Sequence, residues 1–401
     1  MHGRRATKQT TRLATAARVV AFLIGIVALS ASVQPPRAAP VDSATREAER
    51  AGISWALLPI VGYSPETSVS GGAKFRESDL LGWGAIFDVQ GSYALEQQQY
   101  AEVGLEDPHV FESRFSLAAD LVWDSDPSKE FFGLGNDSSG PDPSSSHLAQ
   151  VASARLALGV WLLPELHYSF AIALRQVTIG RPRTTGDPVE ATRDAFPDLV
   201  GVGGGQVRSL RLDLVYDAEP EVLRPIDGWH VGGFVEEVGP TLDNDFDYTF
   251  YSVDVARRSA LYRDWLVLAG RFRAQYVEGV PDEIPFWAQP SLGGADTLRG
   301  YFPDRFIGRG SALANAELRV KVAEFPFLDW WNVTIDAVGF GDFGRVYVAE
   351  EAFSKEVVKD WKSSWGGGVR FFLSSGLVAR VDVGFSAEED ALTYLRFGQM
   401  F

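Results

Sequence analysis

Long stretches of this chain alternate between apolar and polar residues, and this pattern limits the available folds more than any other feature. The even positions of 152–162 are alanine, leucine or valine, and serine, arginine and glycine stand among the odd positions. Residues 209–217 and 377–385 alternate in the same way. A period of two is that of a β-strand, whose successive side chains point to opposite faces. The pattern therefore predicts strands with one apolar and one polar face.

The length of these segments separates a soluble sandwich from a membrane barrel. Several segments reach about ten residues, the length of a tilted strand that crosses a membrane, whereas strands in soluble sheets average about five or six. After residue 31 the sequence has no apolar run long enough for a membrane-spanning helix. We therefore expect an all-β fold, a transmembrane antiparallel β-barrel of about sixteen strands over residues 54–401. The expected connections are the turn-rich stretches Asp124–Asp126, Gly133–Ser146, Gly180–Gly205, Asp217–Gly228 and Val280–Gly310.

The N-terminus has the pattern of a secretory signal peptide. Five basic residues precede the short apolar run 19–31, and small residues follow it. We assign residues 1–32 to this leader, with cleavage as late as about residue 39, and residues 33–53 to a short periplasmic tether. Loss of five positive charges takes the formal net charge from −16 to −21, which argues against a nucleic-acid partner.

A second feature is the segment Leu298–Phe302, in which Arg299 lies among glycines and aromatic residues. A buried arginine keeps its proton, so a carboxylate has to pair with it. Strand parity offers Glu317 on the polar face of 314–322 and Asp342, together with Asp336, on that of 334–344. The sequence thus predicts a loop folded into the barrel lumen. The alternative is an ordinary surface arginine on an external loop, with the carboxylates facing water.

Several motifs together resemble the outer-membrane assembly factors of the BamA/TamA type, also called bacterial surface antigens. Arg299, Gly300 and Tyr301 are similar to the arginine-glycine-aromatic motif of that family's inward loop, and Asp342 and Gly344 to its Asp-x-Gly strand. Residues 131–136, 366–371, 380–386 and 397–401 resemble further elements. The resemblance implies that Arg299 pairs with Asp342 and Glu317. It also implies a bacterial outer-membrane location, with outer-membrane lipid, the cellular barrel-assembly machinery and unfolded client proteins as partners.

The sequence departs from those assembly factors before its first strand. They carry periplasmic POTRA domains there, and residues 33–53 are too few to fold into one. We therefore expect a member that lacks POTRA domains. Whether such a member inserts or translocates other proteins is left open by the sequence.

The last residues alternate and end on an aromatic side chain. Thr393, Leu395, Phe397 and Phe401 share one parity, and Gly398 lies on the other. Together with a signal peptide, this pattern favours an outer-membrane barrel. We interpret Phe397, Gly398 and Phe401 as a C-terminal signal for barrel assembly.

Three classes of function fit these observations to different degrees. The first is an assembly or translocation barrel that acts through a weak seam between its first and last strands, and the second is a passive or plugged channel or structural surface antigen. The third, an outer-membrane hydrolase, has little support, because the five histidines form no H-E-x-x-H pair and no G-x-S-x-G elbow is present. We predict no enzyme activity, no catalytic or metal-binding residues and no cofactor. Tryptophans near strand ends are expected in the interfacial girdles of the barrel, namely Trp55, Trp83, Trp123, Trp161, Trp229, Trp265, Trp330, Trp331 and Trp365.

Overall fold

The computed structural model describes most of the chain from residue 54 onward. The described ranges are 54–137, 142–183, 189–219, 224–327, 331–348, 359–373, 377–398 and 400–401. The signal peptide predicted for 1–32, its cleavage region up to about 39, and the tether predicted for 33–53 all lie outside these ranges.

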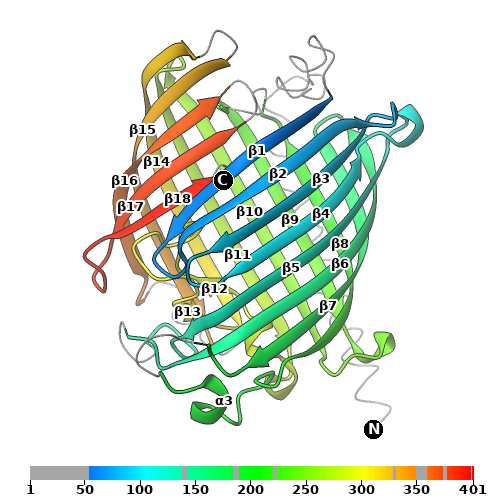
Figure 1. Ribbon diagram of the computed structural model, residues 1–401, viewed down its shortest axis with the longest axis vertical. Helices are drawn as coiled ribbons and strands as arrows, with labels where there is room; N and C mark the ends of the chain where they lie inside the picture. Colours follow the sequence, from blue (N-terminus) through cyan, green and yellow to red (C-terminus); the bar gives the residue numbers. More distant parts are fainter. Residues whose placement is uncertain are drawn as a thin grey trace.

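Sixteen strands of the described residues close into one antiparallel barrel, which confirms the predicted fold class. Each strand pairs with its neighbours in the sequence, except that β11 pairs with β14 across an inserted loop and that β1 pairs with β18 to close the barrel (Figure 1). The wall strands are β1 (Trp55–Ser64), β2 (Ser68–Leu80), β3 (Ala85–Ala94), β4 (Gln99–Asp107), β5 (Phe115–Phe131), β6 (Ser145–Leu163), β7 (Leu166–Gly180), β8 (Gly205–Asp217), β9 (Gly228–Val238), β10 (Tyr248–Tyr262), β11 (Leu266–Gly279), β14 (Gly310–Phe327), β15 (Trp331–Tyr347), β16 (Lys362–Leu373), β17 (Val378–Phe385) and β18 (Leu392–Phe397).

The inserted loop contains the remaining two strands. β12 (Ser291–Leu292) and β13 (Phe306–Ile307) form a separate two-stranded sheet. Among the described residues, helical structure is confined to short turns, which are α3 (Thr192–Ala195), η1 (Val110–Glu112), η2 (Pro240–Leu242), η3 (Pro281–Glu283) and η4 (Phe286–Ala288). No helix of the described residues is long and apolar enough to cross a membrane.

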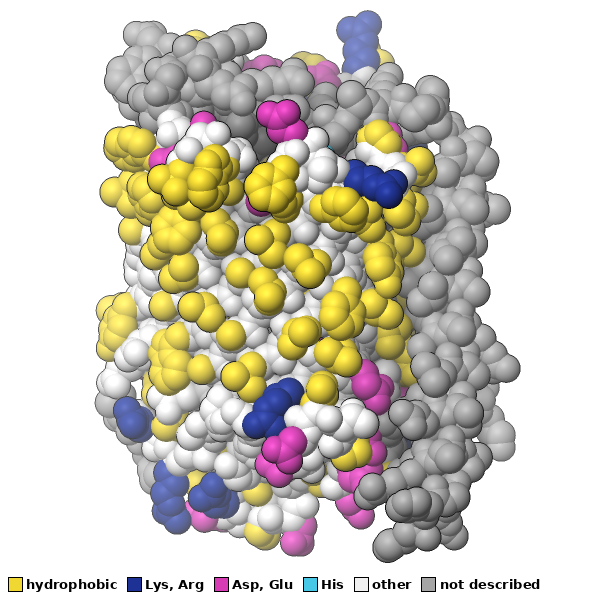
Figure 2. All heavy atoms as spheres, turned by 90° about the vertical axis from the view of Figure 1, so that its right-hand side faces the viewer, with side chains coloured by type: hydrophobic (Ala, Val, Ile, Leu, Met, Phe, Trp, Pro, Cys, Tyr) yellow, Lys and Arg dark blue, Asp and Glu magenta, His cyan; other side chains and the backbone are white. Residues whose placement is uncertain are grey.

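The predicted alternation divides the barrel wall into an outer and an inner face. On β14, Leu318 and Val320 are exposed on the outside, whereas Glu317 and Arg319 are buried on the inside. Figure 2 shows apolar side chains covering the middle of the outer wall, with charged side chains toward both ends. An apolar band around a barrel is what a bilayer requires of the surface that it contacts.

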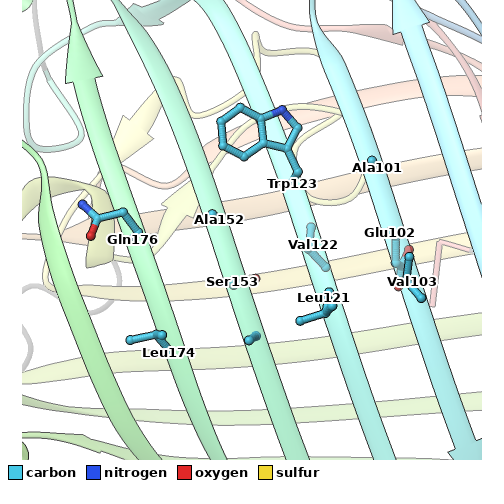
Figure 3. Close-up of a pocket in the computed structure, with 11 residues that line it drawn as sticks. Ala101, Glu102, Val103, Leu121, Val122, Trp123, Ala152, Ser153, Leu174 and Gln176 are labelled. Carbon is cyan, nitrogen blue, oxygen red and sulfur yellow. The ribbon is translucent and has the colours of Figure 1, made fainter.

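Part of this outer wall is hollowed between large side chains. Leu121, Trp123 and Leu174 flank a mostly apolar hollow of about 430 Å³ across β4 to β7 (Figure 3). Ala101 and Ala152 form part of the floor of this hollow, because their side chains are much shorter than those of the neighbouring leucines and tryptophan. In a bilayer, acyl chains would fill a hollow of this kind.

One predicted connection is wrong. We expected a turn at Asp124–Asp126, but β5 continues through these residues to Phe131. The register between β5 and β6 shifts between Asp126 and Lys129, so a bulge absorbs the irregular residues. A bulge bends a strand without ending it, which is why turn-forming residues lie inside a strand here. The other four predicted connections lie between consecutive wall strands apart from one or two residues at their ends, and the last of them also contains two short strands of its own, Ser291–Leu292 and Phe306–Ile307.

Long connections gather at one end of the barrel, which we call the loop end; it is the lower end in Figure 1, where α3 lies. Side chains from β5, β7 and the connection between β11 and β14 meet there in an apolar cluster. Its buried members are Phe131, Val177, Ile179, Phe286 and Ile307. The cluster packs the loop end together, whereas the opposite turn end has shorter connections such as 81–84 and 263–265.

Candidate functional site

The loop between β11 and β14 packs against the inner face of the wall. Its residues Leu292, Leu298 and Tyr301 form one buried cluster with Leu313 of β14 and Val346 of β15. The small sheet of β12 and β13 brings the two ends of residues 293–305 together. This apolar packing fixes the height at which the predicted arginine motif lies in the barrel.

Two glycines shape the entry to this loop. Gly293 and Gly294 have φ values of +121° and +89°, a region that other residues rarely adopt. A Cβ atom on Gly293 would lie 2.0 Å from the carbonyl oxygen of Phe302. The two sides of the loop therefore approach each other more closely than any side chain at Gly293 would allow.

Arg299 is fully buried and pairs with two carboxylates. Its Nε and Nη2 donate to Asp342 at 2.9 and 2.7 Å, and its Nη1 donates to Glu317 at 2.5 Å. The backbone N–H of Arg299 donates to Asp342 as well, at 3.1 Å. The guanidinium carbon lies 3.4 Å from the ring centroid of Phe340. The structure thus places Arg299, Glu317 and Asp342 in direct contact inside the barrel.

Glu317 also belongs to a wider network of charges. It accepts hydrogen bonds from Arg319 at 2.8 Å and from Arg370 at 3.0 Å. Arg370 donates its Nη1 to Asp382 on β17 at 2.7 Å. The network contains three arginines and three carboxylates, namely Arg299, Arg319, Arg370, Glu317, Asp342 and Asp382. Because opposite charges are equal in number and in contact, the group can be buried without a net charge.

The hydrogen bonds of Arg299 and Asp342 limit what these two residues can do chemically. An arginine whose N–H groups already point to carboxylates has little capacity left to bind or protonate a substrate. The carboxylate oxygens of Asp342 likewise accept from Arg299 and from the Nδ2 of Asn315 at 2.8 Å. The arrangement is therefore suited to holding the loop in place, and less suited to a reaction.

Glycines in the wall bring the loop backbone close to it. A Cβ atom on Gly384 of β17 would lie 2.2 Å from the carbonyl oxygen of Arg299, and one on Gly300 would lie 2.4 Å from that of Phe385. A Cβ atom on Gly368 would lie 2.4 Å from the carboxylate of Asp382. Close backbone approach explains the glycines of these strands.

The motif residues Tyr301 and Gly344 hold the loop on either side. The hydroxyl of Tyr301 donates to the backbone carbonyl of Ser363 on β16 at 3.2 Å, and that of Tyr394 on β18 donates to the carbonyl of Tyr301 at 3.0 Å. A Cβ atom on Gly344 would lie 2.9 Å from the side chain of Leu292. The loop is in this way connected to the last strands of the barrel.

Two further ion pairs connect the loop to the wall and to the last hairpin. Arg305 donates its Nε to Glu388 between β17 and β18 at 2.7 Å, and Arg380 of β17 pairs with Asp296. The C-terminal strands are therefore held by the loop as well as by their own ladders.

A charged pair also forms at the loop end. Lys129 lies 2.7 Å from Asp304, which additionally accepts a hydrogen bond from Ser291. Burial alone would raise the pKa of Asp304, but the Lys129 ammonium outweighs it and holds that pKa below its ordinary value.

The first and last strands meet in a weak seam. β1 and β18 share a single described pair, Tyr63 with Leu395. By contrast, β1 pairs with β2 along its whole length from Trp55 to Ser64. Most of the edge of β1 therefore has no strand partner among the described residues.

The C-terminal residues lie on two sides of the wall. Phe397 is the last residue of β18, and Gly398 follows it with a φ of +94°. Phe401 lies in the lumen, where its ring centroid is 5.9 Å from the guanidinium carbon of Arg271 and 5.6 Å from that of Arg319. The shared parity of Phe397 and Phe401 in the sequence is therefore not a shared face of one strand. The left-handed turn at Gly398 ends the alternation.

Two cavities inside the barrel are lined by charged side chains. One, of about 520 Å³, is lined by arginine and aspartate side chains, including Arg273 and Asp254, and by Phe401. The other, of about 490 Å³, is lined by charged side chains such as Lys74, Asp88 and Arg155. Trp161, which we expected in a girdle, lines this second cavity. Within the described residues, no group of three or more His, Cys, Asp or Glu side chains is placed to hold a metal ion.

Sequence reasoning missed half of the network. Arg370 and Asp382 lie in segments that resemble elements of the family, and Arg319 lies on the polar face of 314–322, but the sequence did not single out any of the three. Parity could have found Asp382 and Arg370, because both occupy the polar face of an alternating strand. The ring of Phe340 below Arg299 has no comparable signal in the sequence.

The family follows from a comparison with known domains. The Omp85 superfamily domain matches residues 79–398. The chain belongs to the Omp85 superfamily. This match confirms the resemblance to the BamA/TamA type of barrel that the motifs indicated.

Two kinds of protein with solved structures share the fold of this Omp85 barrel. BamA from Haemophilus ducreyi lacking POTRA domains 1–3 matches with a TM-score of 0.60 at 15% identity, over 86% of this chain and 70% of that one. CdiB from Escherichia coli matches with 0.59 at 13%, over 85% and 62%, and CdiB from Acinetobacter baumannii with 0.53 at 13%, over 86% and 59%. The chain spans less than two thirds of either CdiB chain. At these identities the likeness concerns the fold. No curated protein matches the chain.

Proposed function

We propose that this Omp85 barrel resides in the bacterial outer membrane and assists the insertion or translocation of other polypeptides through the seam between β1 and β18. The observation that carries the proposal is the single pair Tyr63–Leu395, beside continuous ladders on the other sides of both strands. An edge with unpaired N–H and C=O groups can add an incoming strand. In a bilayer, those groups have no water as an alternative partner.

In this proposal the loop with Arg299 is a lock that keeps the rest of the barrel rigid. The loop contacts β14 through Glu317, β15 through Asp342 and β18 through Tyr394. A barrel held in this way can open at one seam without losing the remaining strand order. The protein acts without catalysis, and its partners are outer-membrane lipid, the machinery that assembles it and unfolded clients.

The decisive experiment closes the seam covalently. The chain has no cysteine, so Tyr63→Cys with Leu395→Cys gives one disulfide across the seam. Purified protein in liposomes should accelerate insertion of an unfolded client barrel, and the oxidised double variant should lose this effect and regain it on reduction. As the control, Val381→Cys with Leu395→Cys joins β17 to β18 and leaves the seam free. Equal acceleration by the oxidised seam variant and this control would refute the proposal.

The polar lumen favours one alternative, a passive channel. The two cavities of about 520 and 490 Å³ are lined by charged side chains that could solvate ions. Steady ion conductance in planar bilayers, without any acceleration of client insertion, would favour this alternative.

A further inference from the structure

The backbone of β1 presents alternate residues to its two neighbours. The N–H of Ser78 donates to the carbonyl of Ser54 at 2.7 Å, so this residue, just before β1, points its backbone groups toward β2. In an antiparallel ladder, successive residues point their backbone groups to opposite sides. The even-numbered residues of β1 therefore bond to β2, and the odd-numbered ones, including Pro59 and Tyr63, point toward the seam.

The same reasoning orients β18. The N–H of Gly398 donates to the carbonyl of Val378 at 2.8 Å, so the even-numbered residues of β18 bond to β17. The odd-numbered ones, Leu395 and Phe397 among them, point their backbone groups toward β1. The observed pair Tyr63–Leu395 agrees with both assignments.

A proline on the seam edge removes one donor from it. Pro59 has no N–H, and the β1–β2 ladder runs through it without a shift, opposite Ala73. If the pairing continued in the register of Tyr63 with Leu395, Ile60 would lie opposite Gly398. Pro59 would then lie opposite the residue that follows Gly398. The missing donor thus lies next to the place where Gly398 turns the chain away from the wall.

We propose that Pro59 prevents β1 and β18 from pairing along the whole seam. It also interrupts the ladder of any other strand that pairs with the edge of β1. A strand laid along this edge finds donors at Val61 and Leu57 and none between them. Its carbonyl opposite Pro59 then has no partner, in a membrane where water cannot replace it. In soluble sheets too, a proline on an exposed edge strand opposes continuous pairing, because it lacks the N–H donor.

For the proposed function, on which this second step rests, the interruption has a direct consequence. A client strand held by an uninterrupted ladder would leave the edge slowly, and closure of the seam would exclude it altogether. Pro59 would keep the edge of β1 free for a client strand and would weaken the pairing of that strand with β1.

The test restores the donor and measures closure of the seam. In the double variant Val61→Cys with Phe397→Cys, the two cysteines face each other only if β1 and β18 pair beyond Leu395. The chain has no other cysteine. In this background Pro59→Val should raise the disulfide yield of refolded protein in vesicles about fivefold, the change in a two-state equilibrium that one hydrogen bond produces. Pro59→Ala restores the same N–H with a smaller side chain and should act in the same direction. Pro127→Val, at the bulge of β5 and far from the seam in sequence, is the control and should leave the yield unchanged.

The outcomes separate the two proposals. An unchanged yield in both Pro59 variants overturns the role of Pro59. A higher yield with slower client insertion supports that role and the proposed function together. A higher yield in a protein that accelerates no client, with or without Pro59, supports the role of Pro59 in the seam and overturns the proposed function.

Discussion

Arg299 and Asp342 are 43 residues apart in the sequence and share three hydrogen bonds in the interior of the barrel. Two come from the guanidinium fork, at 2.9 and 2.7 Å, and the third comes from the backbone N–H at 3.1 Å. Planar guanidinium matches a carboxylate in both spacing and direction, which gives the contact geometric specificity as well as energy. The contact therefore sets both the position and the orientation of the loop against β15.

Replacing Arg299 should destabilise the barrel. In Arg299→Ala, Asp342 stays buried without its arginine, while Glu317 keeps Arg319 and Arg370. Loss of one partner of a buried pair costs about 3–5 kcal/mol. Arg299→Lys keeps the charge but not the fork, so we expect it to recover only part of this loss. The measurement is urea-dependent unfolding in detergent or vesicles, together with heat resistance of the folded band on a gel.

The matched control for this experiment is Arg181→Ala. Arg181 pairs with Asp194 at the loop end, and its side chain is 78% exposed. An exposed pair contributes about 0–1 kcal/mol, so this variant should unfold like the wild type. If Arg299→Ala were as stable as Arg181→Ala, the loop would not depend on its arginine.

The pair Arg370–Asp382 should show strong coupling in a double-mutant cycle. Both side chains are buried, and their contact is 2.7 Å. Arg370→Met and Asp382→Asn should each be destabilising, because each removes this short ion pair and leaves the buried network with one uncompensated charge. The double variant should lose about 1–3 kcal/mol less than the sum of the single losses. Additive losses in urea unfolding would mean that the two residues act independently.

Close packing between loop and wall predicts a sharp difference between two glycines. A Cβ atom on Gly384 would lie 2.2 Å from the carbonyl oxygen of Arg299, whereas one on Gly339 would have no atom within 4 Å. Gly384→Ala should force the loop backbone away and cost about 1–3 kcal/mol, while Gly339→Ala should be neutral or slightly stabilising. Protease sensitivity of the loop would report the displacement. Equal behaviour of both variants would contradict the proposed fit.

Much of the architecture is readable from the sequence because a barrel wall has a strict physical period. Strand parity alone places Glu317 and Asp342 on the inner face, and a charged residue on that face is easily distinguished from its apolar neighbours. The count of about sixteen strands also follows from segment lengths. The turn expected at Asp124–Asp126 fails because a bulge uses the same residue types as a turn.

The rest depends on contacts that no local pattern encodes. Glu317 meets Arg370 only because β14, β15 and β16 are adjacent with a particular register, and register cannot be read from alternation alone. The inward position of Phe401 depends on one left-handed residue, Gly398, and on two arginines of distant strands. These relationships become visible only when the strands are assembled.

The turn between β1 and β2 carries a group that makes stability depend on pH. Burial raises the pKa of Glu66 from its ordinary 4.5 to about 8, Lys129 opposes the rise, and Asp126, Asp304 and Glu130 add to it. The folded barrel thus favours the protonated form of Glu66. Its stabilising contribution is complete below pH 4.5 and is lost as the pH rises through about 8.

Raising the pH from 5 to 9 should therefore weaken the wild-type barrel more than Glu66→Gln. The glutamine variant keeps a neutral side chain at all pH values and should show a flatter dependence of the unfolding midpoint in urea. Glu112→Gln, exposed in the turn between β4 and β5 at the opposite end, serves as the control and should follow the wild type. Because Lys129 attracts the ionised form of Glu66, removal of that lysine by Lys129→Met should make the loss at high pH larger. Parallel pH profiles for the wild type and Glu66→Gln would show that Glu66 ionises as freely in the folded barrel as in the unfolded chain.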